Sequence, residues 1–174
     1  MSRLFILEGL DSTGKSTLSK SLAHERRAAY FHAGGHRDLH AGMYAHHCVI
    51  LESAEVNLEN GLDVVIDRLW PSELAYATVL RPQLVDKYVF AYIRDKLRSL
   101  DVTYIYCYSE NVIEAYERYR VTHLSHDHAV FKHLTPEQYS AINTEYRLIF
   151  DNVMHVPYRL EVEGKNIIDF IKAV

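Results

Sequence analysis

The sequence lacks several features that define other classes of protein. Its 174 residues contain no signal-peptide pattern and no run of about eighteen apolar residues, so we expect a cytoplasmic protein without a membrane span. Nineteen Lys and Arg stand against 23 Asp and Glu, and the net charge of -4 leaves no broad basic face for nucleic acid. No repeat or low-complexity linker divides the chain. We therefore expect one domain over residues 1–174.

Cysteine and histidine do not combine into a metal-binding pattern. Cys48 and Cys107 lie in apolar segments without metal-ligand spacing, which is typical of reduced core thiols. His123, His126 and His128 cluster, but no cysteine accompanies them and they do not form a His-Glu-x-x-His helix. The pattern does not favour a metal site at these histidines.

Five continuous apolar runs bounded by polar turns predict buried parallel strands. The runs are Leu4–Leu7, Ala28–Phe31, Val64–Ile66, Thr103–Tyr108 and Arg159–Val162. Stretches with helical character lie between them. This alternation predicts an α/β fold in which helices flank both faces of a central parallel sheet of about five strands.

Two of the helices are indicated by their ends. Residues 135–138 read Thr-Pro-Glu-Gln, which combines an N-cap, a proline at the first helical position and a capping box. An apolar stripe follows at helical spacing, and we interpret it as facing the core and not a ligand. Its members are Tyr139, Ile142, Tyr146, Ile149 and Val153. A second helix is predicted from His46 to Glu59, where Asn60-Gly61 ends it.

The most specific motif is G-x-x-x-x-G-K-[ST], which runs from Gly9 to Ser16 between the first apolar strand and a helix. Its glycines let main-chain N–H groups converge on phosphate oxygens, and the helix N-terminus adds a positive dipole end. Lys15 is predicted to reach the β- and γ-phosphates, and Ser16 to ligate Mg²⁺. The motif predicts a three-layer P-loop NTPase fold that binds ATP and Mg²⁺. The predicted ATP-binding residues are Gly9, Ser12, Thr13, Gly14, Lys15, Ser16 and Thr17.

A nucleotide-binding loop does not by itself define the fate of the γ-phosphate. The guanine-reading Asn-Lys-x-Asp of switch GTPases is absent, and a mechanical ATPase is expected to have a longer chain. A small kinase remains, in which catalysis consists mostly of positioning and charge neutralisation. The alternative outside the enzymes is a nucleotide-binding regulator that has kept the loop and lost phosphoryl transfer.

A second group of charged residues follows the predicted strand Val64–Ile66. Asp67 stands at its carboxyl end, as expected for a carboxylate that organises Mg²⁺ in a parallel sheet. Arg68 comes next and suits the phosphate of an acceptor. A purely structural Asp–Arg pair is the alternative interpretation.

These motifs together resemble a known family. The segment Glu8–Asp11 with Gly14–Thr17, followed by Asp67-Arg68, Ser72 and Leu74–Tyr76, resembles the thymidylate kinase branch of the nucleoside monophosphate kinases. It is also similar to the deoxynucleoside kinases, whose acidic-Arg-Ser motif occupies the same place. The resemblance implies a P-loop kinase that phosphorylates a deoxynucleoside monophosphate in nucleotide biosynthesis, and only the resemblance implies a homodimer. A deoxynucleoside kinase and a kinase of a modified base in DNA are the alternatives.

The resemblance also implies roles for individual residues. Asp11 would face the acceptor sugar or position its phosphate, Arg68 would hold that phosphate, and Asp67 would organise Mg²⁺. Glu8 either supports these groups or is a buried, hydrogen-bonded carboxyl without a catalytic role. If the acceptor is instead a 5'-hydroxyl, Glu8 or Asp67 is the candidate general base.

The catalytic arginine must come from outside the P-loop. Some family members carry it in the loop, where this chain has Ser12 and Thr13. Arg118 and Arg120 lead into a polar segment around residues 118–135 that we predict to be a mobile lid, and they are the nearest candidates to neutralise the transferring phosphoryl group. Solvated arginines on a helix are the alternative.

Departures from the thymidylate kinase pattern concern the acceptor base. The family's Arg-Glu-Pro-Gly-Gly is replaced by His-Ala-Gly-Gly, which makes Arg37 a candidate substitute for the missing arginine. His46 stands near the family's base-reading arginine, and Ala77 replaces a glutamine. Trp70 and Tyr76 are candidates to stack on a base, although core contacts explain them equally well. We expect a pyrimidine or modified pyrimidine as acceptor.

The candidate residues fall into three sets by predicted role. The catalytic set is Lys15, Asp11, Asp67, Arg68, Arg118 and Arg120. The substrate-binding set is Asp11, Arg37, His46, Arg68, Trp70, Ser72 and Tyr76. The metal ligands are Ser16 and Asp67.

Overall fold

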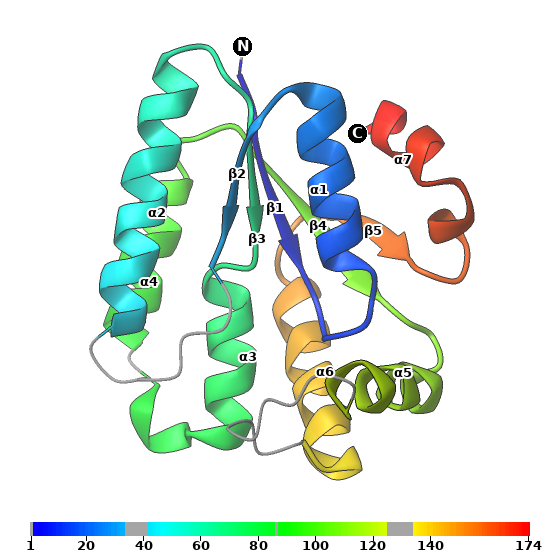
Figure 1. Cartoon of the computed structure of the whole chain (residues 1–174). Coiled ribbons are helices and arrows are strands. Elements are labelled where there is room, and N and C mark those ends of the chain that lie inside the picture. Colours follow the sequence, from blue (N-terminus) through cyan, green and yellow to red (C-terminus); the bar gives the residue numbers. More distant parts are fainter. Residues whose placement is uncertain (1, 34–41, 86, 125–133) are drawn as a thin grey trace.

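The sheet has five parallel strands, as the apolar runs predict. The computed structural model describes residues 2–33, 42–85, 87–124 and 134–174. The strand order is β2-β3-β1-β4-β5 (Figure 1). The strands are β1 (Leu4–Glu8), β2 (Ala29–His32), β3 (Val64–Asp67), β4 (Val102–Tyr108) and β5 (Val156–Arg159).

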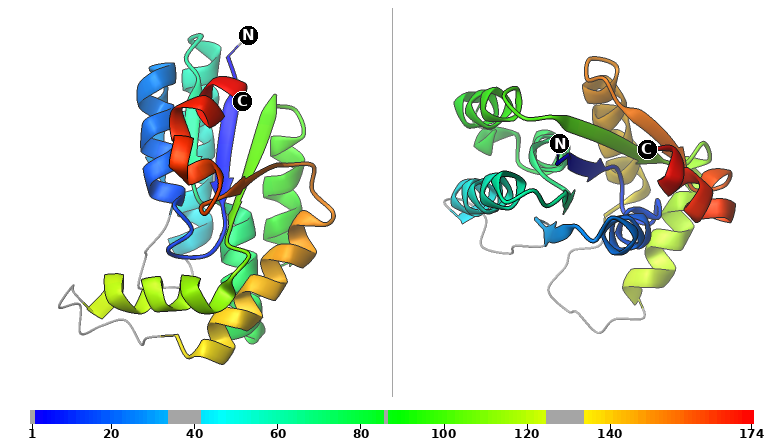
Figure 2. Two further views of the ribbon diagram at one scale, coloured as in Figure 1. Left: turned by 90° about the vertical axis from the view of Figure 1, so that its right-hand side faces the viewer. Right: turned by 90° about the horizontal axis from the view of Figure 1, so that it is seen from above.

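Helices cover both faces of this sheet (Figure 2). They are α1 (Lys15–Arg26), α2 (Gly42–Glu59), α3 (Trp70–Leu80), α4 (Lys87–Leu97), α5 (Val112–Leu124), α6 (Pro136–Phe150) and α7 (Ile167–Ala173), with short turns η1 (Pro82–Leu84) and η2 (Glu163–Asn166). In the described parts of the chain, no helix combines the length and apolarity needed to cross a membrane.

Strand β1 is buried on both sides because its side chains alternate between two helical layers. Phe5 and Leu7 pack with α1 and α7, whereas Leu4 and Ile6 pack with α2 and α4. A third apolar cluster joins α3, α5 and α6 to β4. The three layers predicted from the strand–helix alternation are therefore confirmed.

Parallel pairing brings the chemistry-bearing segments to one edge of the sheet. Leu7 of β1 is in register with Asp67 of β3, and the N–H of Arg68 donates to the Leu7 carbonyl oxygen over 3.0 Å. The loop that follows β1 and the Asp67-Arg68 pair that follows β3 are therefore neighbours. This is the edge where ligands bind in open α/β sheets.

The fifth strand lies earlier in the sequence than the predicted run Arg159–Val162. It spans Val156–Arg159, and residues 160–162 already turn toward η2. Pro157 lies inside it, which is tolerated because β5 is an edge strand and the missing N–H of Pro has no ladder to interrupt on the open side. The predicted helix from His46 begins earlier, at Gly42. The capping box at Thr135 and Gln138 is confirmed.

Candidate active site

The loop between β1 and α1 has the backbone that phosphate binding requires. Gly9 has φ 138°, and a Cβ there would lie 1.9 Å from the Cys107 carbonyl oxygen. Gly14 has φ 82°, and a Cβ there would lie 2.8 Å from Leu160 Cδ1. No side chain caps the start of α1, and its first turn holds no acidic residue. Its open N–H groups and dipole end therefore suit an anion.

Lys15 lies inside this loop and is almost fully buried. Its Nζ donates to the Leu10 carbonyl oxygen over 2.7 Å, and Thr13 Oγ1 donates to the same oxygen over 2.8 Å. Burial, followed by the charge of Arg68, lowers the pKa of Lys15 to about 8, against the opposing charges of Asp11 and Asp67. A polyphosphate at this loop would add negative charge beside the Lys15 ammonium and favour its charged form.

Asp67 and Ser16 fit a magnesium site. Asp67 is fully buried, and its Oδ2 accepts from Tyr30 Oη over 3.3 Å and lies 3.2 Å from His32 Nδ1. Its Oδ1 is buried without a hydrogen-bond partner among the described residues. Burial alone would raise the pKa of Asp67, but His32, Lys15, Arg68 and the Ser16 hydroxyl lower it to about 2.

An anionic carboxylate with an open oxygen near a hydroxyl is a set of hard ligands. Mg²⁺ prefers such oxygens and usually takes only one or two from the protein, with waters and substrate phosphates completing its shell. The described residues contain no cluster of three or more His, Cys, Asp or Glu that would form an all-protein cage. The donor set therefore suits Mg²⁺ bound together with a nucleotide.

Arg68 is held in place from several sides. Its Nη2 donates to Asp11 Oδ1, and its Nη1 donates to Tyr146 Oη over 3.1 Å and to Ser72 Oγ over 3.2 Å. The guanidinium also lies over the Tyr76 ring, 5.4 Å from its centroid. Burial alone would lower the pKa of Arg68, but the Asp11 carboxylate raises it well above the ordinary value. The site thus keeps a fixed cation beside the P-loop.

Glu8 supports the backbone that carries Arg68. Its Oε1 accepts from the Leu69 N–H over 2.5 Å, and its Oε2 accepts from the Ser72 hydroxyl. Burial raises the pKa of Glu8 to about 7, against the lowering effects of Ser72, Arg68 and Leu69. Both oxygens are satisfied and no part of the side chain reaches solvent.

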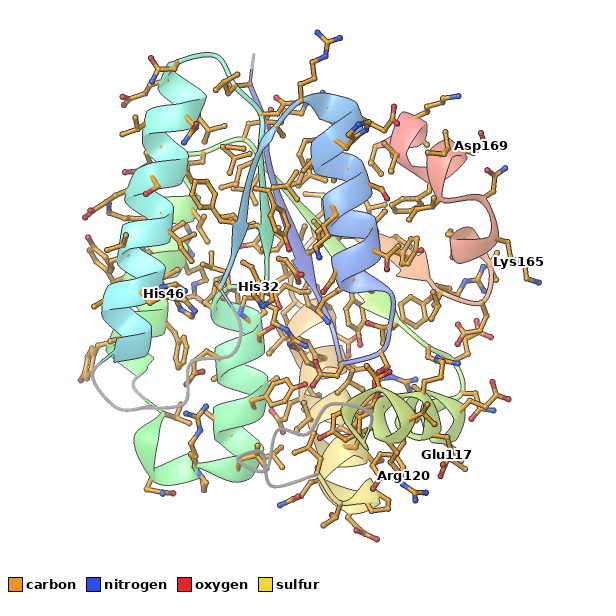
Figure 3. The ribbon with its side chains drawn as sticks, in the orientation of Figure 1. His32, His46, Glu117, Arg120, Lys165 and Asp169 are labelled. Carbon is orange, nitrogen blue, oxygen red and sulfur yellow. The ribbon has the colours of Figure 1, made fainter. Side chains whose placement is uncertain are left out.

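Arg118 reaches the P-loop, whereas Arg120 does not. Arg118 Nε lies 3.4 Å from the Ser12 carbonyl oxygen, and its Nη2 donates to Ser109 Oγ over 3.3 Å and to Glu161 Oε1 over 3.2 Å. Arg120 pairs with Glu117 on the outer side of α5 (Figure 3). Of the two candidates, only Arg118 contacts the P-loop, and its catalytic role stays a prediction.

Comparisons with known proteins show the fold. No family model matches the sequence, and no curated protein does. Among solved structures, the YorR protein of Bacillus subtilis, in complex with phosphorylated GDP, is similar with a TM-score of 0.70 at 20% identity, over 98% of this chain and 94% of that chain. Deoxyadenosine kinase from M. mycoides with bound dATP has a TM-score of 0.63 at 14% identity, over 98% and 97%. A sugar kinase from a Janibacter species has a TM-score of 0.62 at 12% identity, over 99% and 94%.

The chain has the fold of the P-loop kinases. In that fold the predicted substrate-binding residues do not all lie together. Tyr76 Oη donates to Asp11 Oδ2 over 2.7 Å, so it joins the group around Arg68. Trp70 is buried with α2 and α4 and donates through Nε1 to Tyr104 Oη over 3.1 Å. A stacking role for Trp70 stays a prediction.

The remaining predicted residues border this site or fall outside the described part. His46 is half-buried on α2. It lies at the same end of the sheet as His32, the last residue of β2 (Figure 3). Arg37 lies outside the described residues, as do residues 125–133 of the predicted lid. The described start of that segment, Arg118 to Leu124, is the end of α5.

The sequence interpretation missed residues that the P-loop kinase fold brings to the site. His32 reaches Asp67, while Ser109 and Glu161 hold Arg118. The apolar stripe predicts Tyr139 and Tyr146 as core residues, and their burial confirms this, but it does not predict the contacts of their hydroxyl groups with the site. Their hydroxyl groups were the available signal, because a buried tyrosine hydroxyl usually has a hydrogen-bond partner.

Proposed function

We propose that this protein is an ATP- and Mg²⁺-dependent deoxynucleoside monophosphate kinase with a pyrimidine or modified pyrimidine acceptor. One observation carries the proposal: the buried cation Lys15 and the half-buried cation Arg68 both reach the P-loop, since Lys15 Nζ donates to the Leu10 carbonyl oxygen and Arg68 Nη2 donates to Asp11 Oδ1. Cations so placed suit two phosphate groups, one from the donor and one from the acceptor.

The described residues divide the work of phosphoryl transfer. The loop N–H groups and Lys15 hold the donor phosphates, and Arg68 orients the acceptor phosphate. Arg118 adds positive charge where the transferring group develops negative charge. Ser16 and Asp67 would hold Mg²⁺, which neutralises charge on the phosphate oxygens.

The carboxyl groups favour a phosphate acceptor over a hydroxyl acceptor. A 5'-hydroxyl must lose a proton to a base, whereas a phosphate oxygen is already an anion. Asp67 has a pKa of about 2 and is a weak base. Both oxygens of Glu8 accept hydrogen bonds from protein groups, and so do both oxygens of Asp11. None of these three carboxyls is arranged to take a proton from a substrate.

A deoxynucleoside kinase is the second candidate. The match to deoxyadenosine kinase from M. mycoides, which covers 97% of that chain, favours it. This function would require Glu8 to exchange a protein hydrogen bond for the substrate hydroxyl, or Asp67 to act as base in spite of its low pKa.

Release of ADP by the purified protein with Mg-ATP tests both candidates. The acceptors are a panel of nucleoside monophosphates, modified pyrimidines among them, and the matching unphosphorylated nucleosides. Turnover with a monophosphate supports the proposal, and turnover with nucleosides alone supports the second candidate. The variant Lys15→Met is the control for loop-dependent transfer. ATP binding without acceptor-dependent turnover would overturn both and leave a regulator or a kinase of a polymeric acceptor.

A further inference from the structure

Two tyrosine hydroxyls of helix α6 contact different parts of the site, one the P-loop and the other Arg68. Tyr139 and Tyr146 are fully buried and stand seven residues apart, which places them on one face of the helix. Tyr139 Oη donates to the main-chain carbonyl oxygen of Asp11 over 2.7 Å. Tyr146 Oη lies 2.7 Å from Ser72 Oγ and 3.1 Å from Arg68 Nη1. Phenylalanine would fill the same core volume without either contact.

The hydrogen bonds around Tyr146 have defined donors and acceptors. With Glu8 in its carboxylate form, the single hydroxyl proton of Ser72 is donated to Glu8 Oε2, so Ser72 can only accept from Tyr146. Tyr146 Oη in turn accepts from Arg68 Nη1. Donors therefore run in one direction, from Arg68 through Tyr146 and Ser72 to Glu8. A chain of this kind orients the guanidinium, because Nη1 meets Tyr146 and Ser72 while Nη2 meets Asp11.

The hydrogen bond of Tyr139 acts on the P-loop, the part of the site proposed to bind the phosphate donor. Asp11 lies between Leu10, whose carbonyl oxygen receives the Lys15 ammonium, and Ser12, whose carbonyl oxygen meets Arg118. Ser12 has a positive φ of 64°, a conformation that a residue other than Gly adopts at a cost. A hydrogen bond from a buried side chain of α6 to the carbonyl oxygen of Asp11, directly before Ser12, helps to hold the loop in this shape.

We propose that Tyr139 and Tyr146 are positioning residues: Tyr139 sets the P-loop for the donor, and Tyr146 sets Arg68 for the acceptor. The inference rests on the proposed function for the identity of the acceptor group. One rigid helix thereby determines where the donor loop stands relative to the acceptor arginine. Reacting atoms must be held close together and aligned for transfer, which is the reason for such a device.

Steady-state kinetics of Tyr139→Phe and Tyr146→Phe test this assignment. We expect Tyr146→Phe to raise the KM of the acceptor about three- to tenfold and to leave the KM of ATP unchanged, since one hydrogen bond to a charged group is lost. We expect Tyr139→Phe to weaken Mg-ATP binding about three- to tenfold, measured by calorimetry, with the acceptor KM unchanged. Tyr106→Phe is the matched control, because Tyr106 is a buried ring of the same cluster.

A positioning role is distinguished from a purely structural one by which substrate each variant affects. If both phenylalanine variants lower the melting temperature but keep wild-type constants for ATP and acceptor, the tyrosines are structural and the inference is wrong. Equal effects of both variants on both substrates would also overturn it. A wild-type protein without acceptor-dependent turnover refutes the proposed function instead, and the Mg-ATP affinity of Tyr139→Phe still decides the donor half.

Discussion

Replacing Glu8 with Gln should change how the stability of this protein depends on pH. Glu8 is fully buried, and burial raises its pKa from the ordinary 4.5 to about 7. The folded state therefore binds a proton that the unfolded state releases between these two pH values. The contribution of Glu8 to the unfolding free energy is fully present below about pH 4.5 and is lost as the pH rises through about 7. The difference in pKa corresponds to about 3 kcal/mol of unfolding free energy.

A buried histidine acts in the opposite direction over nearly the same range. Burial, followed by the neighbouring His46, lowers the pKa of His47 from 6.5 to about 4. The unfolded state binds the extra proton here, so stability increases as pH rises from about 4 to about 6.5. This contribution is also about 3 kcal/mol. In the wild-type protein the two effects nearly cancel.

Two substitutions separate these opposing effects. Glu8→Gln leaves only the pH dependence of His47, and His47→Gln leaves only that of Glu8. As pH rises from 4.5 to 6.5, the unfolding free energy of Glu8→Gln should increase by about 3 kcal/mol relative to that of wild type. The unfolding free energy of His47→Gln should decrease by about 3 kcal/mol relative to that of wild type over the same range. Urea unfolding at a series of pH values and constant ionic strength measures both slopes. Glu73, whose pKa burial also raises, contributes alike to all three proteins and cancels in the comparison. A Glu8→Gln curve parallel to that of wild type would refute the reasoning.

Three further substitutions test the P-loop and the charges around it. Gly9→Ala places a Cβ 1.9 Å from the Cys107 carbonyl oxygen and should destabilise the fold by at least about 3 kcal/mol, measured by thermal unfolding. Arg118→Ala should lower kcat of ADP release by at least about a hundredfold, because it removes the charge beside Ser12. Asp67→Asn should raise the Mg²⁺ concentration for half-maximal activity by about tenfold, measured by Mg²⁺ titration at constant ATP.

Matched controls give each of these tests a contradicting outcome. Gly61 also has a positive φ but has open space around its Cβ position, so Gly61→Ala should cost less stability than Gly9→Ala. Arg120→Ala should keep kcat within about twofold of wild type, because its only described ion pair is an exposed one with Glu117. Equal losses at Arg118 and Arg120, or unaltered Mg²⁺ dependence in Asp67→Asn, would contradict the assigned roles.

The local parts of the site were predictable because the residue types report directly on backbone and chemistry. Gly9 and Gly14 occupy positive φ angles where a Cβ would clash, and such positions are signalled by glycine itself. The capping box at Thr135 is equally local. The bounds of the fifth strand were not predictable in this way, because Pro157 is acceptable in a strand only at a sheet edge, and edge position is a property of the whole sheet.

The sequence by itself determined the alternation of strands and helices, the P-loop and the acidic-basic pair at the end of β3, because each depends on neighbours in the chain. Only the tertiary structure decided which charges meet. It brought Arg118 to Ser12 and left Arg120 on the surface, and it directed the hydroxyls of two core tyrosines to Asp11 and Arg68. Contacts between residues more than fifty positions apart depend on how the helices pack on the sheet, and hydrophobic spacing specifies which face is buried but not which polar atom it meets there.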